Sequence, residues 1–144
     1  MVDQSTDASA AYVEMGAAFE RDTRYISDRI TRGARVPEVG PCVQPWPVEP
    51  GRYRLIAAKA CPWAHRAIII RSLLGLEDVI SLGTPGPIHD PRSWTFDLDP
   101  GGVDPVLGIE RLQQAYFARF PDYPRGITVP AMVEVATGRV VTND

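Results

Sequence analysis

A strand, a helix and a second strand follow one another at the centre of this sequence, and this order limits the fold most strongly. Arg52–Ala58 is a mostly apolar run, typical of a buried strand. Pro62 suits the first turn of a helix, where its missing N–H costs nothing, and Gly75 suits the left-handed position that ends one. Asp78–Leu82 offers the second strand. Such an order implies two parallel strands joined by a right-handed crossover.

The rest of the chain adds a helix and a hairpin to this unit. Gly83–Pro105 is rich in glycine and proline, so it predicts a long ordered excursion without regular elements. Helical spacing resumes over Val106–Phe120. Val129–Val135 and Arg139–Val141 then predict two strands about a Thr137-Gly138 turn.

This order of elements predicts an α/β, thioredoxin-like fold, with a four-stranded mixed sheet and flanking helices. The sequence stops before the third helix of that fold. The first and third helices would share one face of the sheet. We therefore expect part of an apolar face to stay exposed, at a cost of roughly 25 cal/mol per Å².

The first fifty residues differ in character from the rest, and we predict a boundary between 1–50 and 51–144. Residues 1–11 are small and polar, which favours a disordered tail. The apolar spacing over Tyr12–Ile30 predicts an amphipathic helix. Prolines crowd Val36–Gly51, so this segment is predicted to be an extended loop.

Composition excludes several classes of partner. A chain of 144 residues has room for one ordinary domain. Its net charge of -3 gives no general attraction to nucleic acid or anionic lipid, so neither is predicted as a partner. The N-terminus lacks the basic start and apolar stretch of an export signal, and no apolar run approaches membrane-spanning length. We therefore predict a cytoplasmic protein.

Cys61 stands where the first predicted strand gives way to the helix. Amide donors and the positive end of the helix dipole favour a thiolate there, and Lys59 and Arg66 add positive potential. Such settings can lower a cysteine pKa from about 8.5 to roughly 3.5–7.5. Ala64 occupies the place of the second cysteine of dithiol oxidoreductases, so the second thiol must come from a ligand. We predict Cys61 as a nucleophile.

Other interpretations of this motif stay open at this point. Cys61 could be a small buried apolar residue, as free cysteines often are. A zinc site could combine Cys61 and His65 with Cys42 and His89, although few spaced ligand pairs support it, and we predict no metal. His65 fits a helix residue with a satisfied ring better than a general base.

Several stretches resemble the glutathionyl-hydroquinone reductases, the Xi class of the glutathione transferase superfamily. The most specific is the motif Cys61-Pro62-Trp63-Ala64-His65-Arg66. Ser93–Phe96 resembles the family's Gly-Trp-x-Phe segment, Leu112–Pro130 resembles the approach to its cis-proline, and Val140–Asp144 resembles its Val-Ser-Asn-Glu-Ser segment. The similarity covers about residues 45 to 144.

The resemblance implies a glutathione site around Cys61. A cis Val129-Pro130 bond would let the main chain of Val129 pair with the cysteinyl backbone of glutathione, as a short added strand. Asp144 would meet the ligand's ammonium group. The remaining glutathione-binding positions that the resemblance implies are Trp94, Arg125, Ile127 and Thr128. The sequence departs here from the family's Arg-Val-Thr-Val-Pro, because Gly126 takes the place of the family's arginine and the basic residue moves back to Arg125.

The resemblance also implies a reaction and its partners. In the family, an all-helical C-terminal domain supplies the pocket for an aromatic substrate. The expected partners are glutathione, as co-substrate, and a glutathionylated aromatic molecule, and a homodimer is left open. We expect Cys61 to reduce glutathionyl-hydroquinones through a Cys61-glutathione mixed disulfide. Two alternatives remain: glutaredoxin-like deglutathionylation of proteins with a single thiol, and an inactive module that only binds glutathione or a partner.

Overall fold

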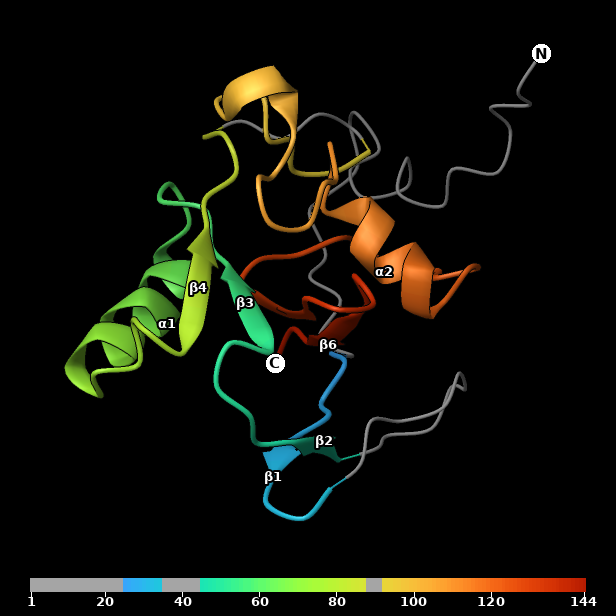
Figure 1. The fold of residues 1–144 in the computed structure, drawn as a ribbon. Coiled ribbons are helices and arrows are strands. Elements are labelled where there is room, and N and C mark those ends of the chain that lie inside the picture. The colour runs from blue at the N-terminus through green and yellow to red at the C-terminus, as the bar shows by residue number, and fades with distance from the viewer. Residues whose placement is uncertain (1–24, 35–44, 88–91) are drawn as a thin grey trace.

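The computed structural model describes residues 25–34, 45–87 and 92–144, and its centre is a four-stranded mixed sheet (Figure 1). The strands lie in the order β4-β3-β5-β6. β3 (Tyr53–Ile56) pairs in parallel with β4 (Ile80–Gly83) and antiparallel with β5 (Ala131–Glu134). β6 (Val140–Thr142) pairs antiparallel with β5 at the edge. The predicted thioredoxin-like fold is confirmed.

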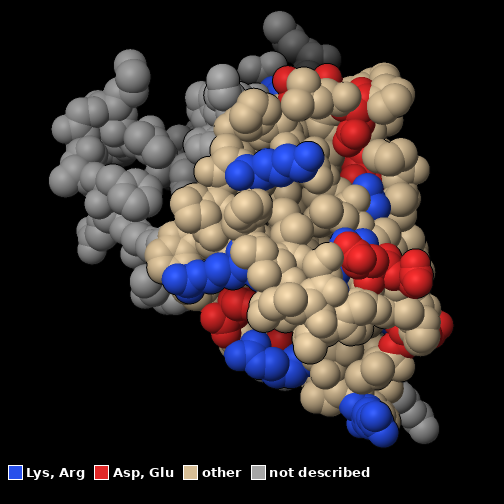
Figure 2. Space-filling view, turned by 90° about the vertical axis from the view of Figure 1, so that its left-hand side faces the viewer, with Lys and Arg blue, Asp and Glu red and all other residues tan. Residues whose placement is uncertain are grey.

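The predicted strand-helix-strand unit is also confirmed. α1 (Pro62–Leu73) connects β3 to β4, with proline at its first position, and Gly75 follows its end with a φ of 63°. Apolar side chains at the end of this helix are exposed: Leu73 is 76% exposed, and Leu74, the residue that follows the helix, is 66% exposed. Figure 2 views the side of the molecule that carries α1, where separate charged side chains stand among broad uncharged surface.

The second helix begins later than predicted. α2 (Gln113–Arg119) covers only the end of the predicted helix Val106–Phe120. The buried Asp104 carboxylate accepts from the backbone N–H groups of Val106 and Leu107, at 3.0 and 2.8 Å. The chain then turns at Gly108, whose φ is 66°. The carbonyl oxygens of Ile109 and Glu110, which a helix over these residues would use, accept from the N–H groups of Asp104 and Phe96, at 2.9 and 3.1 Å.

The excursion between β4 and α2 is largely irregular, as predicted. Its described residues contain one short 3-10 helix, η2 (Pro100–Gly102), while residues 88–91, including His89, lie outside the description. Phe96 anchors the excursion in the core. Farther along the chain, the N–H of Leu112 donates to the carbonyl oxygen of Trp94 at 3.0 Å, and this bond ties the excursion to the start of α2.

The predicted N-terminal helix is wrong in its described part. Ser27 forms an isolated bridge with Thr142 of β6, and β1 (Ile30–Thr31) pairs in parallel with β2 (Trp46–Pro47). The backbone groups of this segment bond to the sheet edge and so cannot close helical turns. The predictions for residues 1–24 and 35–44, including Cys42, lie outside the described residues.

The main core lies between the sheet and α2. Tyr116 of α2 is fully buried, and its hydroxyl donates to the carbonyl oxygen of Thr128 at 2.9 Å. Burial raises the pKa of this phenol.

In the described part of the chain, no helix is both long and apolar enough to cross a bilayer.

Candidate active site

Cys61 occupies the predicted position at the start of α1. It is the N-cap residue, with extended backbone angles of -95° and 116°, and its carbonyl oxygen accepts from the N–H of His65 at 3.1 Å. The first amides of a helix have no partner within the helix, and they carry the positive end of its dipole. Cys61 is half-buried: it packs partly against the core but is not sealed within it.

The loop before β5 brings a carbonyl group to the thiol. The Val129-Pro130 peptide bond is cis, as the resemblance implied. The Cys61 Sγ lies 3.8 Å from the carbonyl oxygen of Val129. Two segments 68 residues apart in the chain therefore meet at the sulfur.

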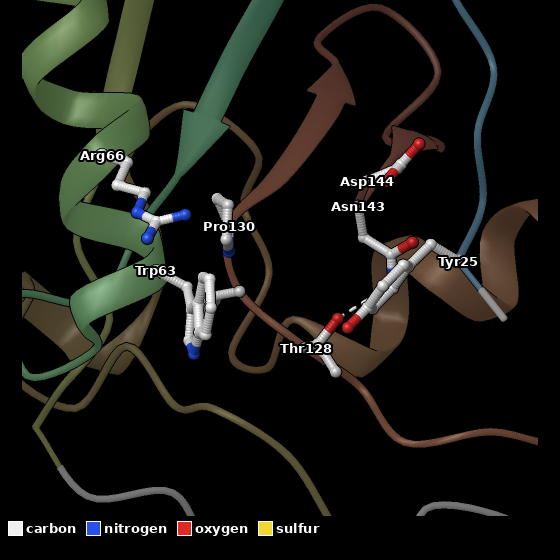
Figure 3. A pocket seen from close by; sticks show the side chains of 8 residues that line it. Tyr25, Trp63, Arg66, Thr128, Pro130, Asn143 and Asp144 are labelled. Atoms are coloured by element: carbon white, nitrogen blue, oxygen red, sulfur yellow. Dashed lines mark hydrogen bonds between the residues drawn. The ribbon is translucent and has the colours of Figure 1, made fainter. Parts of the chain in front are cut away.

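A pocket of about 360 Å³ opens beside this contact (Figure 3). Trp63 and Arg66 of α1 stand on one side of it, Tyr25, Asn143 and Asp144 on the other, and Pro130 between them. Its full lining is Tyr25, Trp63, Arg66, Thr128, Val129, Pro130, Asn143 and Asp144. Cys61 adjoins the pocket through Val129 and is not itself part of this lining.

The two sides of the pocket carry opposite charges. The Arg66 guanidinium lies over the ring of Trp63, 4.4 Å from its centroid. On the other side, Asp144 Oδ2 accepts from Arg29 Nη2 at 3.0 Å. A bound peptide with charged ends would therefore meet a cation on one side and a carboxylate on the other.

Buried polar contacts fix the floor of the pocket. Asn143 Nδ2 donates to Thr128 Oγ1 at 2.8 Å, while the backbone oxygen of Thr128 accepts from Tyr116. Asn143 is itself buried. These contacts hold the stretch before Val129 in place, so they also fix the carbonyl group that faces the thiol.

The predicted site residues divide into two groups. Thr128, Val129, Pro130, Asp144 and Arg66 line the pocket. Ile127 is buried in the core, and Trp94 is half-buried and packs against it. Arg125 and Lys59 also lie outside the pocket lining. The structure thus brings five of the predicted positions together, and the binding roles of all of them stay predictions.

Sequence reasoning missed Tyr25 and Asn143 as pocket residues. Asn143 lies in the last stretch that carries the family resemblance, so its proximity to Asp144 was an available signal. Tyr25 lies in a segment whose spacing suggested a helix, and nothing in the sequence connects it to the cysteine motif. Trp63, a member of that motif, was likewise not predicted to line the site.

The structure describes only two of the four candidate ligands of the zinc alternative, Cys61 and His65. Cys42 and His89 lie outside the described residues, and His65 is exposed on α1. Within the described ranges, no group of three or more His, Cys, Asp or Glu side chains could hold a metal ion.

Comparisons with known proteins agree with this geometry. Residues 60–144 match the glutathione S-transferase N-terminal domain family. Glutathionyl-hydroquinone reductase PcpF from Sphingobium chlorophenolicum is 39% identical over 100 residues, which are 67% of this chain and 31% of that protein.

Two solved structures have the same fold. A glutathione transferase from Gordonia bronchialis, 65% identical, superposes with a TM-score of 0.74 over 84% of this chain and 35% of that chain. The glutathione-bound structure of YqjG, a glutathione transferase homolog from Escherichia coli K-12, is 37% identical and superposes with a TM-score of 0.62, over 69% of this chain and 33% of that one. The chain spans about a third of the length of these relatives. It belongs to the glutathione S-transferase N-terminal domain family, and its matched relatives include a glutathionyl-hydroquinone reductase.

Proposed function

We propose that this chain is the glutathione-binding part of a cysteine-dependent transferase that reduces glutathionyl-hydroquinones. The observation that carries the proposal is the thiol of Cys61 at the first turn of α1, with Sγ 3.8 Å from the carbonyl oxygen of Val129 and a pocket alongside. A thiol in this setting is a nucleophile suited to exchange with a second sulfur.

The reaction has two steps that balance in atoms and electrons. The Cys61 thiolate attacks the sulfur of a glutathionyl-hydroquinone, so that an S–S bond forms and the bond from sulfur to the aromatic carbon breaks. That carbon takes up a proton, and hydroquinone leaves. A second glutathione thiolate then attacks the mixed disulfide, releases oxidised glutathione and restores the Cys61 thiolate. Overall, the thioether sulfur of the substrate and the thiol sulfur of the second glutathione are oxidised to a disulfide while the aromatic carbon is reduced.

Glutathione has matching groups along the pocket. The main chain of Val129 pairs with the cysteinyl backbone, which places the ligand's sulfur beside Cys61. The ligand's ammonium group meets the Asp144 carboxylate. Arg66 supplies positive potential on the side of α1. The proposal assigns no residue of this chain to the aromatic half of the substrate.

The test measures two substrates with one pair of variants. The chain is incubated with glutathione and glutathionyl-menadione, and in parallel with glutathione and a glutathionylated peptide, and the released products are quantified by chromatography. We expect release from glutathionyl-menadione by the chain and by Cys42→Ser, and none by Cys61→Ser. Release from the peptide alone would favour protein deglutathionylation instead.

Alkylation separates an enzyme from a module that only binds. Cys42→Ser leaves Cys61 as the one thiol in the chain, and its rate with iodoacetamide at about pH 6 is compared with that of free cysteine. A faster rate is expected for a thiolate held at a helix N-terminus. A rate no faster than that of free cysteine would refute catalysis by Cys61.

A further inference from the structure

The N-terminal segment, defined here as residues 25–31, lies against the edge of the sheet beside the pocket. The N–H of Ile26 donates to Asn143 Oδ1 at 2.7 Å, and the N–H of Asn143 donates back to the carbonyl oxygen of Ile26 at 3.1 Å. The Thr142 hydroxyl donates to the same carbonyl oxygen at 2.6 Å. The segment therefore lies along β6 at the edge of the sheet, where Ser27 forms an isolated bridge with Thr142.

A buried ion pair holds the same segment from the other side. Asp28 is 1% exposed, and its Oδ2 accepts from Arg119 Nη2 of α2 and from Trp46 Nε1 of β2. Arg119 Nη1 also donates to the carbonyl oxygens of Val140 and Val141, at 3.1 and 2.8 Å. The N-terminal segment is thus tied to α2, β2 and β6 together.

These contacts fix where Tyr25 lies. The residue precedes Ile26, whose backbone bonds to Asn143 in both directions, and its side chain lines the pocket beside Thr128 and Asn143. Figure 3 shows Tyr25 on the side of the pocket opposite Trp63 and Arg66, near Asp144. A phenol in this place offers a ligand one flat apolar face and one hydroxyl group.

The charges of the pocket determine which end of glutathione would reach Tyr25. Once the cysteinyl part lies at Cys61 and Val129, the two ends of the tripeptide point to opposite sides. The glycyl end carries only a carboxylate, which suits the Arg66 guanidinium and is repelled by Asp144. The glutamyl end carries an ammonium group, which suits Asp144.

We infer that the N-terminal segment builds one wall of the pocket and that Tyr25 contacts the glutamyl end of glutathione, an inference that rests on the proposed function. Tyr25 packs its ring against that end and donates its hydroxyl to the glutamyl carboxylate. Arg29, in the same segment, holds the Asp144 carboxylate at the pocket rim through its ion pair. The segment thus makes the site selective for γ-glutamyl thiols.

The test compares three disulfides that differ only in their ends: those of glutathione, γ-glutamylcysteine and cysteinylglycine. Each exchange forms a mixed disulfide on Cys61 and releases one thiolate, and its rate constant is followed by mass spectrometry in the Cys42→Ser background. In Tyr25→Ala we expect roughly 10-fold slower exchange with the two γ-glutamyl disulfides, about the worth of one lost hydrogen-bonded contact. Exchange with the cysteinylglycine disulfide is expected to stay unchanged.

Matched variants keep the result interpretable. Tyr25→Phe retains the ring and is expected to show part of the same selective loss of exchange rate. This variant provides the test if Tyr25→Ala unfolds. Arg32→Ala changes an exposed residue just past this segment, away from the pocket lining, and is expected to behave as wild type.

Each outcome bears on a different claim. In one outcome, the wild-type chain is selective, but Tyr25→Ala and Tyr25→Phe either leave its exchange rates unchanged or lower them equally for all three disulfides. That outcome would overturn the inference alone. Equal wild-type rates with all three disulfides would overturn both the inference and the proposed glutathione site.

Discussion

Cys61 and Tyr53 show how one residue's surroundings decide its chemistry. Cys61 ends the loop after β3 at the first turn of α1, half-buried and in contact with Val129, so its sulfur combines access with a fixed orientation. Tyr53 of β3 is buried with Trp46 and Val141, and its hydroxyl donates to the carbonyl oxygen of Pro47. The first residue contacts the loop before β5 at the edge of a pocket, while the second holds β2 against the sheet.

The Tyr53 phenol gives a prediction about alkaline pH. Burial raises its pKa from 10 to about 12, so the folded chain keeps a proton that the unfolded chain loses in this range. The stability from the neutral phenol is complete below pH 10 and is lost as the pH rises from about 10 to 12. We expect the free energy of unfolding, measured in urea, to fall across this window.

Tyr53→Phe provides the comparison for this window. The variant has no phenol to ionise at this position, so its free energy of unfolding is expected to fall less steeply between pH 10 and 12. Its stability at neutral pH is expected to be lower, because the carbonyl oxygen of Pro47 loses its donor. Parallel curves for the two chains across the window would contradict the assignment.

Among the elements, the connection between the N-terminal segment and the domain depends on a few buried polar groups. β1 and β2 are only two residues each and form a separate small sheet. Asp28 and Arg119 join this region to α2 and β6, and the ring of Trp46 lies 5.4 Å from the Arg119 guanidinium. Short strands of this kind gain their position from such tertiary contacts, because their own ladder bonds are few.

Removing Asp28 tests this connection. Asp28→Ala leaves the Arg119 guanidinium buried without its carboxylate, so we expect the free energy of unfolding to fall by about 3–5 kcal/mol. The measurement is urea unfolding followed by circular dichroism. Arg29→Ala is the control, since its ion pair with Asp144 is exposed and is expected to contribute about 0–1 kcal/mol. Equal losses in the two variants would contradict a buried connection.

At the scale of the whole molecule, α1 buries apolar side chains on one side and leaves others exposed to water. Ala64 packs inward against the sheet, whereas Ile70, Leu73 and Leu74 are exposed. The chain also spans only about a third of its relatives' length. Exposed apolar side chains grouped at the end of one helix favour association, so this surface is a candidate contact for the homodimer that the sequence left open and for other forms of association.

We expect the chain to associate with rising concentration, as measured by sedimentation velocity. Leu73→Glu is expected to shift the distribution toward monomer, with a change in stability within about 0.5 kcal/mol, because the side chain is exposed. Leu98→Glu is the matched control: Leu98 is 72% exposed but lies far from α1 in the sequence. An equal shift in the control would point to a general charge effect.

The sequence by itself determined the parts of the fold whose signals are local. α1 begins at Pro62, which lacks an N–H, and it ends just before Gly75, which adopts a positive φ. The apolar runs of β3 and β4 likewise follow from composition alone. The cysteine motif placed Cys61 at the start of α1, and the family resemblance indicated the cis bond at Val129-Pro130.

Tertiary structure decided the features that depend on partners far away in the chain. α2 starts later than predicted because the carbonyl oxygens of Ile109 and Glu110 accept from the N–H groups of Asp104 and Phe96, so they are not available for a longer helix. The N-terminal segment lies along β6 because Asn143 and Thr142 bond to the backbone of Ile26. Helical spacing records only which side chains are apolar. It cannot show which backbone groups a distant residue will bind. The bonds from Thr142 and Asn143 to the backbone of Ile26, in place of helical bonds, put Tyr25 in the pocket.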